Sequence, residues 1–341
     1  RNTEASVDAL WRERDVGTTE SDDLNPDDLD FGTGTRRDTR LTLGLRTGID
    51  APFGLDLTAR DNRRSYSGTT DPDLFDTTRR SLDATARFEI DPRITLRLIA
   101  GIERYEAENA DQTDRTTTEL GFGGTFEVTP RLTADVDLTF DEIETEEVGG
   151  TTETDGIGID GSLTREMANG TLTASLRSRE TVNGRRSTLR IGRALDLPDG
   201  TLSFSLGATK SEGLSTEPVA ELSYTRDLPR GQFDVSLRQS VETNNNDQET
   251  LSSRLSLGID QDINNVSSWS ADFSLADVNA LDTGAEDKRR VDFTLSYRRD
   301  IGADWDLVSG YEFSHAREDG VEDREANTVF LTLEKTFSFR P

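Results

Sequence analysis

The chain has 341 residues, no cysteine, one methionine, one histidine and a formal net charge of −28 at pH 7. Only 32% of the residues are hydrophobic, which is little for the core that a soluble protein of this length must bury. The absence of cysteine excludes disulfides, a thiol nucleophile and a thiolate metal site. The acidic excess argues against nucleic acid as a partner, because nucleic acid is bound by lysine and arginine.

The sequence contains no stretch close to the ~18–20 consecutive apolar residues of a transmembrane helix. A transmembrane β-strand needs only ~9–11 residues, and every second one faces lipid, so its pattern is an alternation rather than an apolar run. The chain opens at Arg1 without a signal peptide, and we expect it to be a processed or truncated product.

Alternation of this kind begins near the start of the chain. We expect a first strand near residues 5–15 and a hairpin from about residue 38. Leucine occupies every second position from Leu41 to Leu45, and after a break at 50–52 apolar residues alternate again over 53–59. A period of two places successive side chains on opposite faces of a strand.

The next two hairpins repeat the pattern around turns that contain proline. Residues 82–90 and 94–102 alternate on either side of one turn, and residues 120–128 and 132–140 alternate on either side of the next. Proline, glycine, asparagine and aspartate supply the backbone angles that tight turns require. Later turns of the same composition are 168–170, 197–200, 228–231, 264–265 and 302–304.

Longer polar segments join the strands at their other ends. They are 18–35, 67–78, 109–116, 144–154 and 244–249. This asymmetry is typical of a barrel with short periplasmic turns and longer acidic extracellular loops. We therefore predict one all-β domain over residues 1–341, a transmembrane antiparallel up-and-down β-barrel of about 18 strands, integral to the bacterial outer membrane. An even number of strands leaves both termini on the periplasmic side.

An acidic soluble β-sandwich is the main alternative, because its strands also alternate. A sandwich needs two packed inner faces, whereas one face of most strands expected here carries Asp, Glu, Arg, Thr, Ser and Gly. Lipid tolerates no unpaired backbone groups, so a membrane sheet with one apolar and one wet face has to close. Aromatic residues near strand ends, among them Trp11, Tyr105 and Trp305, are then expected in girdles at the membrane surface.

The end of the chain carries a resemblance to a known class of proteins. Val329, Leu331, Leu333, Phe337 and Phe339 alternate up to Arg340 and Pro341. The pattern resembles the aromatic-ending C-terminal strand of bacterial outer-membrane proteins, although two residues follow the last aromatic side chain here. The resemblance implies recognition by the barrel-assembly machinery. It concerns architecture, porin-like or exopolysaccharide-export-like, and identifies no single family.

No motif predicts an active site, and we expect neither enzymatic activity nor a cofactor or metal. His315 is the only histidine and lies beside Ser314 and near Glu318, so a catalytic triad would have to use it. A solvated histidine at the barrel rim is the simpler interpretation. The acidic runs at 22–30 and 142–147 lack the spacing of a calcium loop. Solvated loops explain these runs, and weak divalent bridging to lipopolysaccharide phosphates is the alternative.

The inward-facing register supplies the candidate pore-lining residues. The arginines are Arg46, Arg60, Arg87, Arg97, Arg177, Arg179, Arg190, Arg238 and Arg254. The carboxylates are Asp56, Asp83, Glu89, Asp135, Asp137, Asp234 and Asp272. Part of this set could form a selectivity surface for a charged solute. The alternative is that opposite charges on neighbouring strands pair along the lumen wall.

An eighteen-stranded barrel is wide enough for an aqueous channel. The sequence has no plug-sized segment and no clear version of the long constricting loop of porins. The longest candidate for an inward-folded loop is Gly17 to Arg37. We expect an open, porin-like conduit for hydrophilic solutes, with a cation preference that follows from the acidic excess. The alternatives are an exopolysaccharide-export barrel and a non-transport scaffold or anchor. The expected partners are outer-membrane lipid, lipopolysaccharide, the barrel-assembly machinery and an envelope protein.

Overall fold

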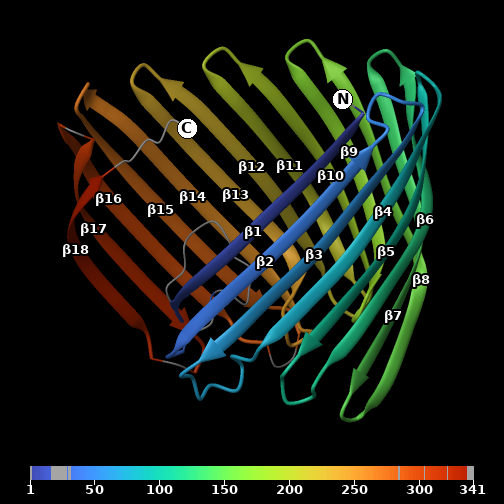
Figure 1. The fold of residues 1–341 in the computed structure, drawn as a ribbon, viewed down its shortest axis with the longest axis horizontal. Helices are drawn as coiled ribbons and strands as arrows, with labels where there is room; N and C mark the ends of the chain where they lie inside the picture. Colours follow the sequence, from blue (N-terminus) through green and yellow to red (C-terminus); the bar gives the residue numbers. More distant parts are fainter. Residues whose placement is uncertain are drawn as a thin grey trace.

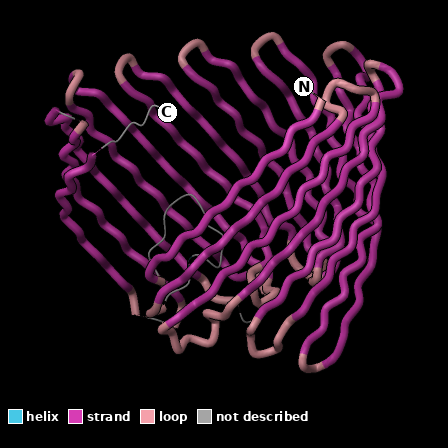
Figure 2. The backbone as a smooth tube through the Cα atoms, viewed as in Figure 1, coloured by secondary structure: helices cyan, strands magenta, loops and turns pink. Residues whose placement is uncertain are grey.

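The computed structural model describes residues 2–16, 29, 32–282, 285–302, 304–320 and 322–335. These residues form eighteen β-strands in one antiparallel sheet, drawn in Figures 1 and 2. No helix in this described part of the chain is long and apolar enough to cross a membrane. The strands are β1 (Thr3–Asp15), β2 (Thr35–Thr47), β3 (Phe53–Ser67), β4 (Thr77–Asp91), β5 (Ile94–Ala107), β6 (Asp114–Thr129), β7 (Leu132–Glu147), β8 (Gly150–Met167), β9 (Gly170–Thr181), β10 (Gly184–Leu197), β11 (Gly200–Ser211), β12 (Thr216–Leu228), β13 (Gly231–Thr243), β14 (Glu249–Asn264), β15 (Ser267–Ala280), β16 (Lys288–Gly302), β17 (Trp305–Glu318) and β18 (Arg324–Lys335).

Each strand pairs antiparallel with the strand that follows it in the chain, from β1 through to β18. This is the up-and-down connectivity that the sequence predicts, and the strand count agrees as well. Figure 1 shows the sheet wrapping round, so that β1 to β4 lie in front of β10 to β13. Among the described residues no ladder joins β18 to β1, so the described sheet has these two strands as its edges.

The ladders align apolar residues of neighbouring strands at one level. One such row crosses β3 to β8 through Leu57, Ala84, Ala100, Leu120, Phe140 and Ile157. These side chains face outward, and Leu120 and Ile157 are 58% and 60% exposed. A soluble protein rarely exposes so much contiguous apolar surface, whereas lipid covers it on a membrane barrel. The predicted division into an apolar outer face and a polar inner face is confirmed.

The two ends of the barrel differ, and we call them the tight-turn end and the long-loop end. The N-terminus lies at the tight-turn end (Figure 1), where the backbone N–H of Gly48 donates to the carbonyl of Asn2 at 2.8 Å. Glycines in the left-handed region close turns at this end, for example Gly170 with a φ of 114°. Glycine adopts such angles without steric cost, which explains why these turns are so short.

One loop expected at the opposite end is much shorter than the sequence suggested. The polar segment 144–154 is not a loop, because the ladder between β7 and β8 continues through Glu144 and Glu153. Only Val148 and Gly149 connect the two strands. A strand that extends beyond the membrane no longer needs an apolar face, so the absence of apolar alternation did not mark its end.

Candidate functional site in the barrel lumen

Charged side chains at the predicted pore-lining positions lie on the opposite face of the sheet from the apolar outer band. Arg46 and Asp56 face each other across β2 and β3, with 2.7 Å between Nε and Oδ1. Arg60 and Asp83 join β3 to β4, with 2.5 Å between Nη1 and Oδ2. Because both pairs are about half exposed, their contribution to stability is small.

Arg97 on β5 makes the most extensive of these contacts. Its Nη2 atom lies 2.5 Å from Oδ1 of Asp135 and 2.7 Å from Oδ1 of Asp137, both on β7. The Nη1 atom of Arg97 donates to Oγ1 of Thr125, on the intervening strand β6, at 2.8 Å. A planar guanidinium suits this arrangement, since it offers several N–H groups in one plane. The network ties three strands of the lumen wall together.

The other predicted residues are spread along the wall and do not converge on one site. Arg177 binds Asp160 and Arg179 binds Glu119, each at 2.7 Å. Pairing along the wall, rather than one selectivity surface, therefore accounts for most of the predicted set. Arg87 donates to the backbone carbonyls of Gly48 and Ile49. Asp234, Arg254 and Asp272 line a cavity of about 1080 Å³ on the wall formed by β12 to β18. The remaining predicted residues are Glu89 on β4, Arg190 on β10 and Arg238 on β13.

The residues that converge are in a loop that sequence reasoning did not single out. Residues 244–248 connect β13 to β14 at the long-loop end, and they contact β6 and β5, which are seven and eight strands before β13 in the chain. The hydroxyl of Tyr105 on β5 donates to Oδ1 of Asn245 at 3.5 Å. Arg115 on β6 forms an ion pair with Asp247. We call residues 244–248 the inward loop, because it bridges the mouth of the lumen.

The conformation of the inward loop follows from its own sequence. The side-chain oxygen of Asn244 accepts from the backbone N–H of Asn246 at 3.0 Å and of Gln248 at 2.9 Å. Asparagine favours turns because its side chain can bind the backbone two residues further on. Asp247 has a φ of 59°, a left-handed conformation that aspartate tolerates better than most residues. The loop is thus a self-bonded turn rather than an extended strap.

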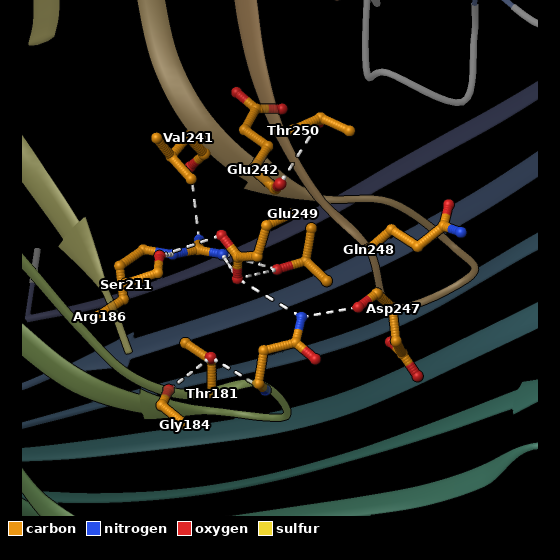
Figure 3. Close-up of polar contacts among 12 residues, drawn as sticks. Thr181, Gly184, Arg186, Ser211, Val241, Glu242, Asp247, Gln248, Glu249 and Thr250 are labelled. Carbon is orange, nitrogen blue, oxygen red and sulfur yellow. Dashed lines mark hydrogen bonds and ion pairs between the residues drawn. The ribbon is translucent and has the colours of Figure 1, made fainter. Parts of the chain in front are cut away.

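A buried carboxylate holds the base of the inward loop to the neighbouring wall. Glu249, the first residue of β14, is 1% exposed and pairs with Arg186 on β10. Its oxygens also accept from Ser211 at 3.1 Å and from Thr243 at 3.3 Å. Asn183, in the β9–β10 turn, donates to the carbonyl of Asp247 at 2.6 Å. Figure 3 shows this cluster gathered where β10 and its preceding turn meet the inward loop.

Burial changes the protonation behaviour of the inward loop. Desolvation raises the pKa of Asp247 above its ordinary value of 3.8, and the positive charges of Arg115 and Arg79 oppose this rise without cancelling it. Removing a carboxylate from water disfavours its charged form. The inward position of the loop therefore binds a proton more tightly than an outward, solvated position would.

A cavity of about 290 Å³ lies beneath the inward loop, against the wall formed by β1 to β5. Six arginines line it, and Asp38 is the one acidic residue among the described residues that do so. We call it the arginine cavity. Its floor includes Tyr105, and the guanidinium of Arg79 stands 5.1 Å from the centre of that ring. Its arginines are Arg12, Arg36, Arg40, Arg63, Arg64 and Arg79.

Leu29 enters the lumen from another side of the sheet. Leu29, between β1 and β2, is 4% exposed and packs against Ala276 and Val278 on β15. Both β15 residues have the same strand parity as the lumen-facing Asp272, so Leu29 lies inside the barrel. Leu29 belongs to the segment 17–37, the longest candidate for a folded loop in the sequence, and it lies inward together with residues 244–248 of another hairpin.

Tyr105 corrects one detail of the aromatic girdle. It is 4% exposed and clusters with Phe75 and Ala107, so it lies within the lumen mouth rather than at the membrane surface. Tyr105 and the inward-facing Arg97 are separated by an even number of positions on β5, so their side chains lie on the same face of the sheet. This spacing in the sequence already assigns Tyr105 to the lumen. Trp11, by contrast, is 64% exposed.

The candidate catalytic and metal-binding residues are not assembled into a site. Ser314 and His315 are adjacent on β17, so their side chains lie on opposite faces of the sheet. Ser314 donates to Asp292 at 2.7 Å, and His315 lies 3.8 Å from Asp323. The described residues contain no cluster of His, Cys, Asp or Glu suited to a metal ion. The acidic run at 22–28 and Asp30 lie outside the described residues.

Comparison with known proteins identifies the architecture. No family model matches the sequence, and no curated protein matches it. Among solved structures, the FrpB iron transporter from Neisseria meningitidis is similar, with a TM-score of 0.63, 10% identity, and coverage of 97% of this chain and 69% of that one. The ferric enterobactin receptor from Pseudomonas aeruginosa, bound to enterobactin, gives a TM-score of 0.51, 8% identity, and coverage of 96% and 68%.

Identities of 8–10% show the fold alone. The fold agrees with the exposed apolar band and with the polar inner wall of the described strands. Together these observations confirm the class and the location that the alternating sequence predicts. The chain is an integral bacterial outer-membrane β-barrel of the antiparallel up-and-down type.

Proposed function

We propose that this barrel is a selective outer-membrane conduit for small hydrophilic solutes, narrowed at its long-loop end by the inward loop. The charged inner wall supports an aqueous path, since Arg97 and its partners would be costly to bury in a dry lumen. The structural neighbours are an iron transporter and a siderophore receptor. Their names are consistent with a role in transport and do not specify the solute of this chain.

The observation that carries the proposal is the contact between the inward loop and the far wall. Asp247 binds Arg115 on β6, and its carbonyl accepts from Asn183 beside β10. A segment held at both sides divides the mouth into smaller openings. Pore diameter and the polar groups that line a constriction determine which solutes pass. We therefore favour a selective conduit over the wide, unspecific pore that the strand number alone suggested.

Single-channel recording in a planar bilayer tests the proposal. The purified, folded chain should give stable but small conductance steps. The double variant Arg115→Gln with Asn183→Ala should give larger steps, because the loop loses its contacts to both walls. Arg238→Gln is the matched control, since this lumen-facing arginine of β13 touches neither the loop nor its partners and approaches Glu242 only to 4.0 Å. A folded barrel that inserts and stays silent in all three forms would contradict a conduit.

A further inference from the structure

The arginine cavity has the opposite charge to the molecule around it. The chain contains 67 acidic and 39 basic residues, yet the described lining of this cavity holds six arginines and one aspartate. Random placement on so acidic a chain would give the reverse balance. Like charges repel one another strongly inside a barrel with low-dielectric walls. An arrangement that brings them together therefore indicates a negatively charged occupant.

Asp38 balances only part of this positive charge. Its carboxylate lies 2.9 Å from Nε of Arg36, 3.1 Å from Nε of Arg64 and 3.5 Å from Nη2 of Arg14. These contacts orient guanidinium groups on the adjacent strands β1, β2 and β3. Asp61 pairs with Arg63 at 2.8 Å, and Glu103 lies 3.5 Å from Arg79. Among the described residues, three carboxylates therefore meet six arginines, and positive charge remains in excess.

Two further arginines complete the cavity and are accessible from the lumen. Arg40 is exposed and makes no hydrogen bond or ion pair to the described residues. Arg79 has a side chain that is 49% exposed, lies 3.5 Å from Glu103 and stacks over Tyr105. The guanidinium of Arg79 lies over the ring of Tyr105, and both residues line the cavity. Both side chains are placed to donate to a ligand in the mouth.

We propose that the arginine cavity binds a small solute that carries two or more carboxylate or phosphate groups. This inference rests on the proposed function and names the class of solute that the conduit takes. Guanidinium groups bind carboxylate and phosphate through paired N–H bonds in one plane, which a single point charge cannot match. A volume of about 290 Å³ is close to the lower end of the ~300–1,000 Å³ range for small-molecule sites, so the occupant is compact.

The position of the cavity suits capture at the entrance. Asn245 of the inward loop and Tyr105 are among its lining residues, so a ligand held there lies directly beside the constriction. Clefts lined by one sign of charge raise the local concentration of oppositely charged solutes. The cavity would therefore concentrate an anionic solute where the lumen is narrowest.

Calorimetric titration of the full chain, folded in detergent at low ionic strength, tests the inference directly. The probes are citrate and inorganic phosphate, with glucose as a neutral comparison. At least one anion should bind saturably and glucose should not. The double variant Arg40→Gln with Arg79→Gln should bind the anion with an affinity lower by about tenfold or more, because it removes two charged donors. Arg238→Gln should bind like the unmodified chain, and added salt should weaken binding.

Two results would overturn the anion site. One is the absence of saturable binding for both anions by the unmodified chain. The other is equal weakening in the cavity variant and in Arg238→Gln. Thermal unfolding of each variant shows whether a loss of binding reflects a loss of fold. A barrel that binds citrate but never conducts would contradict the proposed conduit and support the anion site. A barrel that conducts but binds neither anion would contradict the anion site and support the conduit.

Discussion

Arg115 and Asp247 form an ion pair although 132 positions separate them in the chain. Arg115 is the second residue of β6, and Asp247 lies in the left-handed turn of the inward loop between β13 and β14. The pair can form only when the sheet has curled far enough to bring these strands face to face. It converts a wide barrel mouth into a constricted one. The predictions below follow from this contact and from the register of the wall.

Acidification should close the conduit through Asp247. Burial raises the pKa of this carboxyl in the inward position. Protonation of Asp247 therefore stabilises the inward position relative to a solvated, outward one. This stabilisation is complete below the ordinary aspartate pKa of 3.8 and is lost as pH rises through the raised pKa. Conductance should therefore fall as pH is lowered from neutral towards 4, and Asp247→Asn should flatten the dependence. Recordings across this range check the sign, and a conductance that rises on acidification would contradict it.

Glu249→Gln should destabilise the barrel. The substitution keeps the shape of the side chain but removes the charge that pairs with Arg186, so a partly buried guanidinium loses its counter-ion. We expect a loss of about 2–3 kcal/mol in the free energy of unfolding. Thermal or urea unfolding in detergent measures it. Glu221→Gln, an exposed glutamate on β12, is the control and should change little.

Adjacent residues on β5 should respond oppositely to a charge. Leu98 is 55% exposed on the outer band, while Ile99 faces the lumen and pairs with Gly121. Leu98→Arg should destabilise the folded barrel in lipid by about 2–4 kcal/mol, and Ile99→Arg should cost far less because water solvates the charge. Equilibrium unfolding in liposomes compares the two. Equal losses would mean that the outer face of this strand is not in lipid.

The arginine cavity should also affect ion selectivity. Removing positive charge from the mouth leaves the carboxylates of the β12–β18 wall, such as Asp234 and Asp272, to dominate the lumen. The double variant Arg40→Gln with Arg79→Gln should therefore shift the reversal potential towards a stronger cation preference. Arg238→Gln carries the same change of charge at a distance from the mouth. A shift of equal size in that variant would assign the effect to total charge rather than to the cavity.

Local patterning was sufficient to predict the strands. Leu120 and Phe122 flank Gly121 on β6, and this period of two fixes both the strand and the face that each side chain occupies. Turn residues such as Pro130 marked where one strand ends and the next begins. Strand ends beyond the membrane were harder to predict, as the β7–β8 hairpin shows, because there neither face needs to be apolar.

The functional residues depended on information that the sequence does not carry locally. The inward loop has the composition of any polar turn, and nothing near Asn245 indicates that it will lie beside Tyr105. Likewise, the cavity arginines come from β1, β2, β3 and β4, and their excess disappears in the acidic average of the chain. Which loops turn inward depends on contacts between strands that lie on opposite sides of the curved sheet.

The sequence by itself determined that the chain forms alternating, antiparallel strands with one apolar and one polar face, and therefore an outer-membrane barrel. The reason is that strand geometry and hairpin turns are set by neighbours in the chain. Only the tertiary structure decided that the mouth is narrowed, that Arg115 meets Asp247, and that six arginines share one cavity. These features require residues far apart in the chain to be brought together by the curvature of the sheet.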